Sequence, residues 1–128
     1  MANSDKPTTI KEWCAAAYAQ SARSGFHDGE ALLTARERIA VYLINIQGEV
    51  SEAWESYRAG TLHSPCDKAE KMQAMGLRAL TCLEEELADV VIRCFDVAEA
   101  YGLDLQSAVE IKHAYNGTRA PKHGGKLA

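Results

Sequence analysis

Apolar residues recur at three- and four-residue steps in two long stretches of the chain, and this spacing restricts the fold more than any other feature. The first stretch runs from Ala31 to Ala59 and the second from Leu77 to Tyr101. Each pattern predicts a long amphipathic helix, and no stretch shows the alternation of apolar and polar residues that is typical of a strand. We therefore predict an all-α fold. The apolar stripes consist of Ile39, Leu43, Ile46, Val50, Ala53 and Tyr57 in the first helix and of Leu80, Leu83, Leu87, Val90, Cys94 and Val97 in the second.

Two shorter helices are predicted at the ends of the chain. One runs from Ile10 to Arg23 and begins after Thr8 or Thr9, with Glu12 in its first turn; the other runs from Leu105 to about Asn116. Short connections favour antiparallel neighbours, so we expect four helices in one domain that spans residues 1–128.

The segments between these helices are predicted from their glycines and polar residues. Gly60 and Gly102 are expected to end the two long helices, and Asp104 to begin the last one. Residues 61–67 are predicted to form a loop and residues 68–76 a loop or a short helical turn. Beyond about residue 117, a proline and a glycine pair favour a flexible tail.

The charge and composition of the chain exclude several classes of partner. A net charge of −4 argues against non-specific binding to nucleic acid, although the segment 111–128 carries four basic residues and no acidic one. No apolar run approaches the roughly 18 residues of a membrane span. The four cysteines lack metal-binding spacing, and the N-terminus lacks the apolar stretch of a signal peptide, so we expect a cytoplasmic protein.

Two pairs of acidic residues border the two apolar stripes. Glu49 and Glu52 lie three residues apart in the first long helix, and Glu86 and Asp89 repeat this spacing in the second. Residues three apart share one face of a helix, so each pair can reach a single ion. If the two stripes pack together, all four carboxylates meet at one seam; solvated acidic faces are the alternative.

A cluster of four carboxylates favours a divalent cation, because like charges and partial burial raise the pKa values of the bare acids. Oxygen ligands suit Mg²⁺ or Mn²⁺ better than Zn²⁺. Mg²⁺ usually keeps several waters and shares its coordination sphere with substrate phosphates. The sequence therefore predicts a Mg²⁺ site, which Mn²⁺ could also fill, and chemistry on phosphate esters.

Three segments of the chain share a recognisable pattern around these acids. They read GEVSEAWESYRAG at 48–60, EEELADVVIRCFDVAEAYGLDL at 84–105 and KHAYNGTRAPKHGGK at 112–126. In this order they resemble the MazG-like family of all-α nucleoside triphosphate pyrophosphohydrolases, whose metal signature also pairs Glu-x-x-Glu with Glu-x-x-Asp on successive helices. The resemblance implies a MazG-like four-helix bundle. Because a chain of this size buries only about two-thirds of its surface, we expect a homodimer or homotetramer to complete it.

The resemblance also implies a reaction. Members of this family hydrolyse a nucleoside or deoxynucleoside triphosphate between its α- and β-phosphates, which gives the monophosphate and pyrophosphate and suits house-cleaning of the nucleotide pool. Glu49, Glu52, Glu86 and Asp89 would hold Mg²⁺ as the catalytic group, and one of them, or Glu85, would orient the attacking water.

Several basic and polar residues are candidates for binding the substrate. Arg93 continues the face of Glu86 and Asp89 and is expected either to touch a phosphate or to form a salt bridge between helices. In the family that the chain resembles, the C-terminal region closes over the nucleotide; the alternative is a solvated helix with a frayed tail. The candidates in this region are Lys112, Tyr115, Asn116, Arg119 and Lys126.

Two other functions fit the same sequence. A helical oligomer of this fold could bind a nucleotide or a protein partner without turnover, or the chain could hydrolyse another metabolite that contains a pyrophosphate group. Both alternatives would keep the same helices. The first releases no product, and the second acts on a different substrate.

Overall fold

The computed structural model describes residues 5–119 and 121, and within them it shows an all-α protein. The all-α prediction is confirmed, since this part of the chain contains five α-helices, one 3₁₀ turn and no strand, apart from an isolated bridge between Pro65 and Thr81. The elements are α1 (Ile10–Arg23), η2 (Glu30–Leu32), α2 (Ala35–Arg58), α3 (Ala69–Ala74), α4 (Cys82–Ala100) and α5 (Leu105–Gly117).

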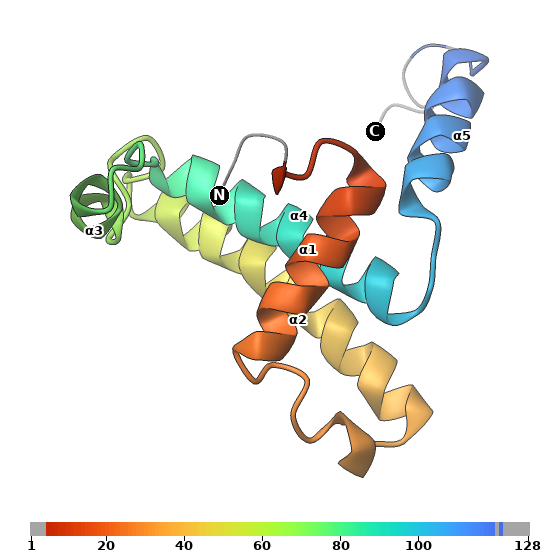
Figure 1. Ribbon diagram of the computed structural model, residues 1–128. Helices are drawn as coiled ribbons and strands as arrows, with labels where there is room; N and C mark the ends of the chain where they lie inside the picture. Colours follow the sequence, from red (N-terminus) through yellow and green to blue (C-terminus); the bar gives the residue numbers. More distant parts are fainter. Residues whose placement is uncertain (1–4, 120, 122–128) are drawn as a thin grey trace.

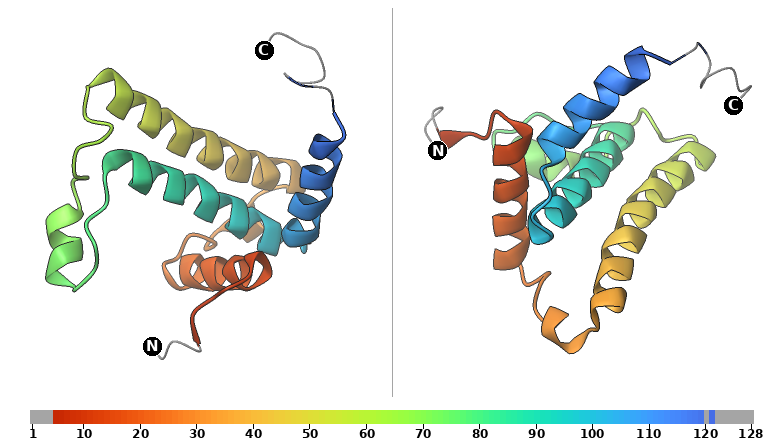
Figure 2. Two further views of the ribbon diagram at one scale, coloured as in Figure 1. Left: turned by 90° about the horizontal axis from the view of Figure 1, so that it is seen from above. Right: turned by 90° about the vertical axis from the view of Figure 1, so that its right-hand side faces the viewer.

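Helix α4 lies at the centre of the arrangement. It runs antiparallel beside α2, while α1 crosses α4 and packs on it (Figure 2). The short α3 lies at one end of this pair, in the connection from α2 to α4, and α5 lies at the opposite end, where it packs on α1 (Figure 1). The side chains at the contact between α2 and α4 therefore lie between α1 and the end of the pair that carries α3.

Both long helices begin later than their apolar patterns predict. Helix α2 starts after Thr34 rather than near Ala31, because the Thr34 hydroxyl accepts from the Glu37 N–H at 3.1 Å and the Glu37 carboxylate accepts from the Thr34 N–H at 2.8 Å. The same reciprocal cap joins Thr81 and Glu84, so the predicted start of α4 at Leu77 is also wrong.

The residues before α4 are extended rather than helical, because they pair with the loop that follows α2. The Cys66 N–H donates to the Leu80 carbonyl and the Cys82 N–H donates to the Ser64 carbonyl, both at 2.9 Å. Between these paired segments, residues 69–74 form the short helix α3. Of the two predicted alternatives for residues 68–76, a loop or a short helical turn, the structure has the helical one. The connection is thereby fixed against the first turn of α4.

The ends of the helices follow the sequence signals closely. Helix α1 has the predicted bounds and is capped by Thr9, whose hydroxyl accepts from the Glu12 N–H at 3.1 Å. Gly60 and Gly102 take the left-handed φ values of +73° and +62° directly after α2 and α4, which glycine adopts without strain. Asp104 caps α5 as predicted. Most of the predicted flexible tail lies outside the described residues.

The buried core of the described chain is small, and many large apolar side chains remain exposed. The buried apolar residues are Cys14, Ala17, Tyr42, Cys66, Ala69 and Ala98. On α2, Leu43, Val50 and Tyr57 of the predicted apolar stripe are exposed, and so is Trp54, so the stripe is only partly buried. None of the described helices combines the length and the apolar character needed to cross a membrane.

Candidate metal centre

Helices α2 and α4 bring three carboxylates together. Glu49 and Glu52 come from adjacent turns of α2 and Glu86 from α4, and one carboxylate oxygen of each lies within 4.8 Å of the other two. Asp89, one turn further along α4 than Glu86, lines the same cavity as Glu49 and Glu52. The two acidic pairs that the sequence singles out therefore face each other across the α2–α4 seam.

Burial and mutual repulsion keep these acids from ionising as easily as free carboxylates. Burial, followed by the nearby charge of Glu52, raises the pKa of Glu86 to about 7. Burial and then the charge of Glu49 also raise the pKa of Asp89. The bare cluster is thus electrostatically unfavourable, and a cation among these oxygens would relieve it.

One oxygen of the cluster has no partner in the described protein. The Oε2 atom of Glu86 is buried and accepts no hydrogen bond there. A buried polar atom without a partner costs free energy of about 1–3 kcal/mol, so such atoms in native proteins usually meet water or an ion. The three converging carboxylates offer only oxygen ligands, and this donor set fits a hard divalent cation such as Mg²⁺.

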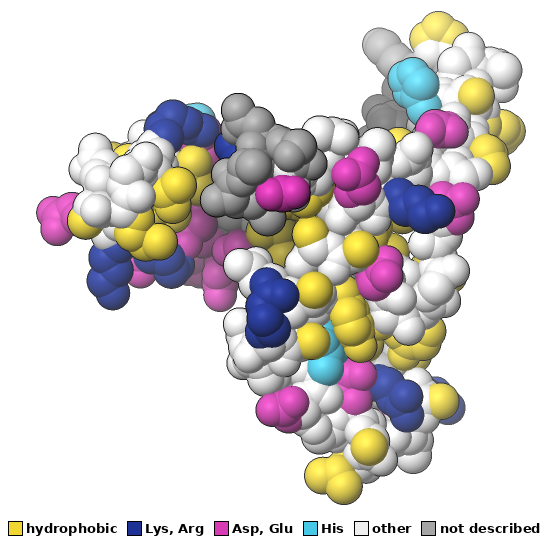
Figure 3. All heavy atoms as spheres, in the orientation of Figure 1, with side chains coloured by type: hydrophobic (Ala, Val, Ile, Leu, Met, Phe, Trp, Pro, Cys, Tyr) yellow, Lys and Arg dark blue, Asp and Glu magenta, His cyan; other side chains and the backbone are white. Residues whose placement is uncertain are grey.

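A cavity of about 490 Å³ opens beside the acids. Glu49, Glu52 and Asp89 form its acidic part, and side chains of α1, Phe26 and the second half of α4 line another part. Figure 3 shows acidic side chains gathered in the recess between α1 and the α3 end of the molecule. The remaining lining residues are Ala17, Gln20, Ser21, Ser24, Lys68, Ile92, Arg93 and Asp96.

Arg93 lines this cavity and contacts both one of its acids and an aromatic ring. Its Nε donates to Oε1 of Glu49 at 3.0 Å, and its guanidinium lies 5.3 Å from the centroid of the Phe26 ring. The salt bridge between helices that the sequence offers as one alternative is therefore present. Arg93 also lines the cavity, so the contact with a phosphate stays a prediction.

The predicted substrate residues of the C-terminal region lie apart from the acids within one chain. Lys112 and Asn116 line a separate surface hollow on α5, and the Lys112 ammonium lies 4.9 Å from the centroid of the Tyr115 ring. Arg119 follows α5, and Lys126 lies outside the described residues. Their role in substrate binding stays a prediction, and among the candidates that the structure describes, only Arg93 lines the acidic cavity.

Lys68 is a lining residue that the sequence interpretation missed. It comes from the connection between α2 and α4, where only a loop or a short turn could be predicted, and its ammonium contacts the carboxylate of the buried Glu85. The available signal was weak, since Lys68 follows Asp67 in a polar segment with no helical periodicity. Only the fold brings it to Glu49, Glu52 and Asp89.

A second polar cluster, centred on His27, adjoins the cavity. The Ser21 hydroxyl donates to Oδ1 of Asp96 at 2.7 Å, and Nε2 of His27 lies 2.7 Å from the same hydroxyl. Nδ1 of His27 lies 2.5 Å from Glu30, which also accepts from the Tyr42 hydroxyl at 2.6 Å. The Ser21 hydroxyl has two acceptors, Asp96 and the Tyr18 carbonyl at 3.0 Å, so both ring nitrogens of His27 are placed to donate.

This His27 cluster ties α1, the turn after it, α2 and α4 together. Burial alone lowers the pKa of His27, but its hydrogen bond with Glu30 and the charge of Asp96 outweigh burial and raise the pKa above the ordinary value. The cluster could not be found by spacing, because Tyr42 and Asp96 lie 15 and 69 residues from His27 in the sequence.

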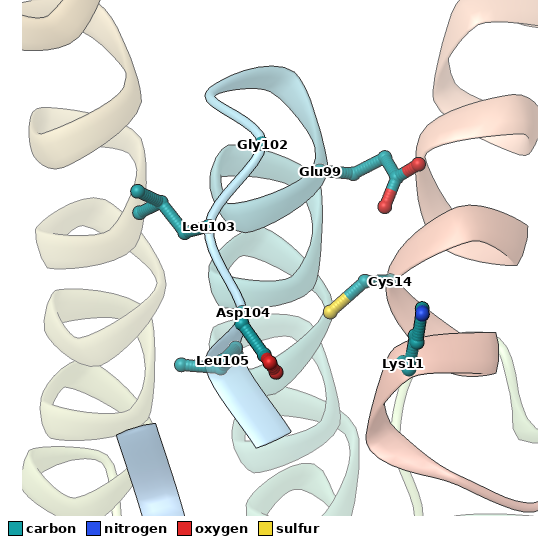
Figure 4. Close-up of a pocket in the computed structure, with 7 residues that line it drawn as sticks. All are labelled: Lys11, Cys14, Glu99, Gly102, Leu103, Asp104 and Leu105. Carbon is teal, nitrogen blue, oxygen red and sulfur yellow. The ribbon is translucent and has the colours of Figure 1, made fainter. Parts of the chain in front are cut away.

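Another cavity, of about 300 Å³, lies at the junction of α1, α4 and the turn into α5 (Figure 4). Cys14 and Lys11 reach it from α1 and Glu99 from α4. Burial, followed by the charge of Glu99, raises the pKa of the Cys14 thiol, which disfavours the reactive thiolate. This cavity offers no set of converging ligands like that of the acidic cavity.

Comparison with known proteins gave no match: no family model, no curated protein and no solved structure aligns with this chain.

Proposed function

We propose that this protein is a Mg²⁺-dependent nucleoside triphosphate pyrophosphohydrolase with a MazG-like helical fold. The observation that carries the proposal is the convergence of Glu49, Glu52 and Glu86 within 4.8 Å, with a buried oxygen of Glu86 that has no partner in the described protein. The substrate is a nucleoside or deoxynucleoside triphosphate, and the products are the monophosphate and pyrophosphate.

All four acids act as ligands of the metal. Glu49, Glu52 and Glu86 supply the converging oxygens, and Asp89 completes the set from the adjoining turn of α4. A bound Mg²⁺, or Mn²⁺ in its place, would polarise phosphate oxygens and lower the pKa of an attacking water. The reaction then needs positioning and charge stabilisation from the protein rather than a covalent intermediate.

The adjoining cavity is suited to the rest of the nucleotide. Its volume of about 490 Å³ falls in the range of small-molecule sites, and it combines polar side chains of α1 with the exposed ring of Phe26. An aromatic face can stack a nucleobase, and Gln20 and Ser24 can hydrogen-bond its edge or the sugar. Arg93 stands between this region and Glu49, where it can counter phosphate charge.

We further propose that copies of the chain associate, as a homodimer or homotetramer. The exposed apolar side chains of α2 and α4, such as Trp54 and Leu87, form faces that a second copy would cover. Association would also bring the α5 residues of one copy within reach of another, which gives Lys112 and Asn116 a route to a nucleotide.

The experiment that tests the function is a panel assay of pyrophosphate release. The common nucleoside and deoxynucleoside triphosphates, and several modified ones, are incubated with Mg²⁺, with Mn²⁺ or with EDTA, and both products are quantified. We expect metal-dependent release of pyrophosphate with the matching monophosphate. Orthophosphate release would indicate another phosphohydrolase, and binding without turnover would indicate a nucleotide-binding protein.

Two variants connect the activity to the acids. Glu52→Ala and Asp89→Ala are each expected to lower kcat by at least about a hundredfold, the order of loss typical when a charge-stabilising group is removed. Glu55→Ala is the matched control, since Glu55 lies one turn from Glu52 on α2 and pairs only with the exposed Arg58 in the described structure. Full metal-dependent turnover by Glu52→Ala or Asp89→Ala would contradict the proposed metal centre.

A further inference from the structure

Lys68 is held in a fixed place at the acidic cavity. Its neighbours Cys66 and Ala69 are buried, at 5% and 6% exposure, and the segment is hydrogen-bonded to the residues that begin α4. The ammonium contacts Glu85, whose side chain is 10% exposed, while the side chain of Lys68 stays 59% exposed. A buried carboxylate thus orients a cation that still faces solvent.

The position of Lys68 along α4 separates it from Arg93. Glu85, which holds Lys68, and Arg93 are eight residues apart on α4, which is about 12 Å along the helix axis. Asp89 lies midway between them on the same face, and Lys68, Asp89 and Arg93 all line this cavity. The cavity therefore has a cation on each side of its acids.

The two ends of the cavity differ in the chemistry that they offer. The Arg93 end adjoins Phe26, Ile92 and the polar side chains of α1, which suits a base and a sugar. The Lys68 end offers an ammonium beside Asp67 and Glu85 and has no aromatic ring among its lining residues. A lysine ammonium binds phosphate as a compact point charge.

We propose that Lys68 binds the β- and γ-phosphates of the substrate, the part that leaves as pyrophosphate, and that Glu85 is the residue that positions it. This inference rests on the proposed function, since it assigns the orientation of the nucleotide in the same cavity. The nucleoside lies toward Phe26 and Arg93, the scissile α–β linkage lies at the acids, and the distal phosphates lie toward α3. In this assignment Glu85 holds Lys68, and one of the four metal-binding acids orients the water.

The test compares inhibition by the two products, because they occupy opposite ends of the cavity. Lys68→Met removes the charge but keeps the length of the side chain, Lys68→Arg keeps the charge, and Lys71→Met on α3 is the control, since Lys71 does not line the cavity. We expect Lys68→Met to weaken inhibition by Mg²⁺-pyrophosphate about tenfold, the loss of one charge-assisted hydrogen bond. Inhibition by the matching nucleoside monophosphate should stay unchanged.

The remaining variants test the positioning role. Lys68→Arg should retain most of the pyrophosphate affinity, and Lys71→Met all of it. Glu85→Gln should weaken pyrophosphate inhibition selectively, as Lys68→Met does, because the ammonium loses its anchor. A purely structural ion pair would lower the melting temperature without favouring one product over the other. Unchanged pyrophosphate inhibition in Lys68→Met, or an equal loss for both products, overturns the inference.

A binding measurement separates this inference from the proposed function. If the wild-type protein releases no pyrophosphate from any nucleotide, the proposed function fails. Calorimetric titration with Mg²⁺ and inorganic pyrophosphate then decides the role of Lys68 on its own. Binding to the wild type that Lys68→Met weakens about tenfold supports the phosphate site; equal binding, or none to the wild type, overturns it.

Discussion

The Nε atom of Arg93 on α4 donates a 3.0 Å hydrogen bond to Oε1 of Glu49 on α2, and this contact joins the two helices at the edge of the acid cluster. The side chains of Arg93 and Glu49 are only 28% and 12% exposed, so solvent screens the pair less than a surface ion pair. The same arginine thus offsets acidic charge and lines the cavity beside it.

Replacing Arg93 should affect both substrate binding and stability. We expect Arg93→Met to raise KM about tenfold, because a phosphate would lose a charge-assisted contact, and to lower the free energy of unfolding by about 1–3 kcal/mol. Steady-state kinetics and urea denaturation measure the two effects.

The matched control for Arg93 is Arg58→Met on α2. Arg58 pairs with Glu55 at 3.3 Å, but both side chains are largely exposed, so its loss should change stability by less than about 1 kcal/mol and leave KM unaltered. A loss of stability in Arg93→Met with an unchanged KM would restrict Arg93 to the role of a salt bridge between helices.

Glu86→Gln should stabilise the metal-free protein and abolish its response to metal. The raised pKa of Glu86 means that the ionised side chain is less favourable in the folded than in the unfolded protein. This penalty grows as pH rises from the ordinary pKa of 4.5 to about 7 and is then constant. At pH 8 we therefore expect Glu86→Gln to unfold at higher temperature than the wild type in EDTA.

Added metal should reverse this order. A ligand at a hundred times its dissociation constant adds about 2.7 kcal/mol to the stability of the protein that binds it. We expect Mg²⁺ or Mn²⁺ to raise the melting temperature of the wild type by several degrees and to leave that of Glu86→Gln unchanged. Equal metal-induced shifts in both proteins would place the ion elsewhere.

The His27 cluster should make stability depend on pH in the opposite sense to Glu86. A histidine whose pKa is raised on folding contributes stability that is fully present below its ordinary pKa of 6.5 and is lost as pH rises through the higher value of the folded protein. The difference in unfolding free energy between the wild type and His27→Gln should therefore be largest near pH 6 and shrink toward pH 9.

Urea denaturation at several pH values measures this difference. His63→Gln is the control, since His63 lies exposed in the loop after α2 and its replacement should cost less than about 0.5 kcal/mol at each pH. A gap between the wild type and His27→Gln that stays constant from pH 6 to pH 9 would contradict a protonated His27 in the folded protein.

Association of chains should depend on the outer face of α2. Trp54 and Tyr57 stack there with ring centroids 5.1 Å apart, although Trp54 is 57% exposed. We expect sedimentation analysis to show a dimer or tetramer for the wild type and a smaller species for Trp54→Glu, with the helical circular dichroism signal retained. A wild-type protein that sediments as a monomer at micromolar concentration would exclude the proposed association.

Local signals account for the parts of the fold that the sequence predicts well. Thr9, Gly60, Gly102 and Asp104 each act within one turn of a helix end, and the structure has each in the predicted role. The starts of α2 and α4 were predicted wrongly because apolar periodicity was extended past two local signals. Thr34 with Glu37, and Thr81 with Glu84, carry the spacing of a reciprocal cap in the sequence itself.

The parts of the candidate site that the sequence could not predict depend on contacts between distant segments. Two acids three residues apart can be recognised on any helix, so Glu49, Glu52, Glu86 and Asp89 could be selected in advance. Lys68 reaches them only because the connection before α4 pairs with the loop after α2. The His27 cluster likewise exists only once α1 has packed on α4.

Helix α4 carries Glu85, Glu86, Asp89, Arg93 and Asp96 at steps that return to one face of the helix. An α-helix turns by about 100° per residue, so a single inserted or deleted residue between Asp89 and Arg93 would rotate one half of this row away from the other. The acids and the His27 cluster therefore stay on the same side of α4 only while the number of residues between them is unchanged. Natural variation between them can exchange side chains but cannot change the number of residues without separating the two sites.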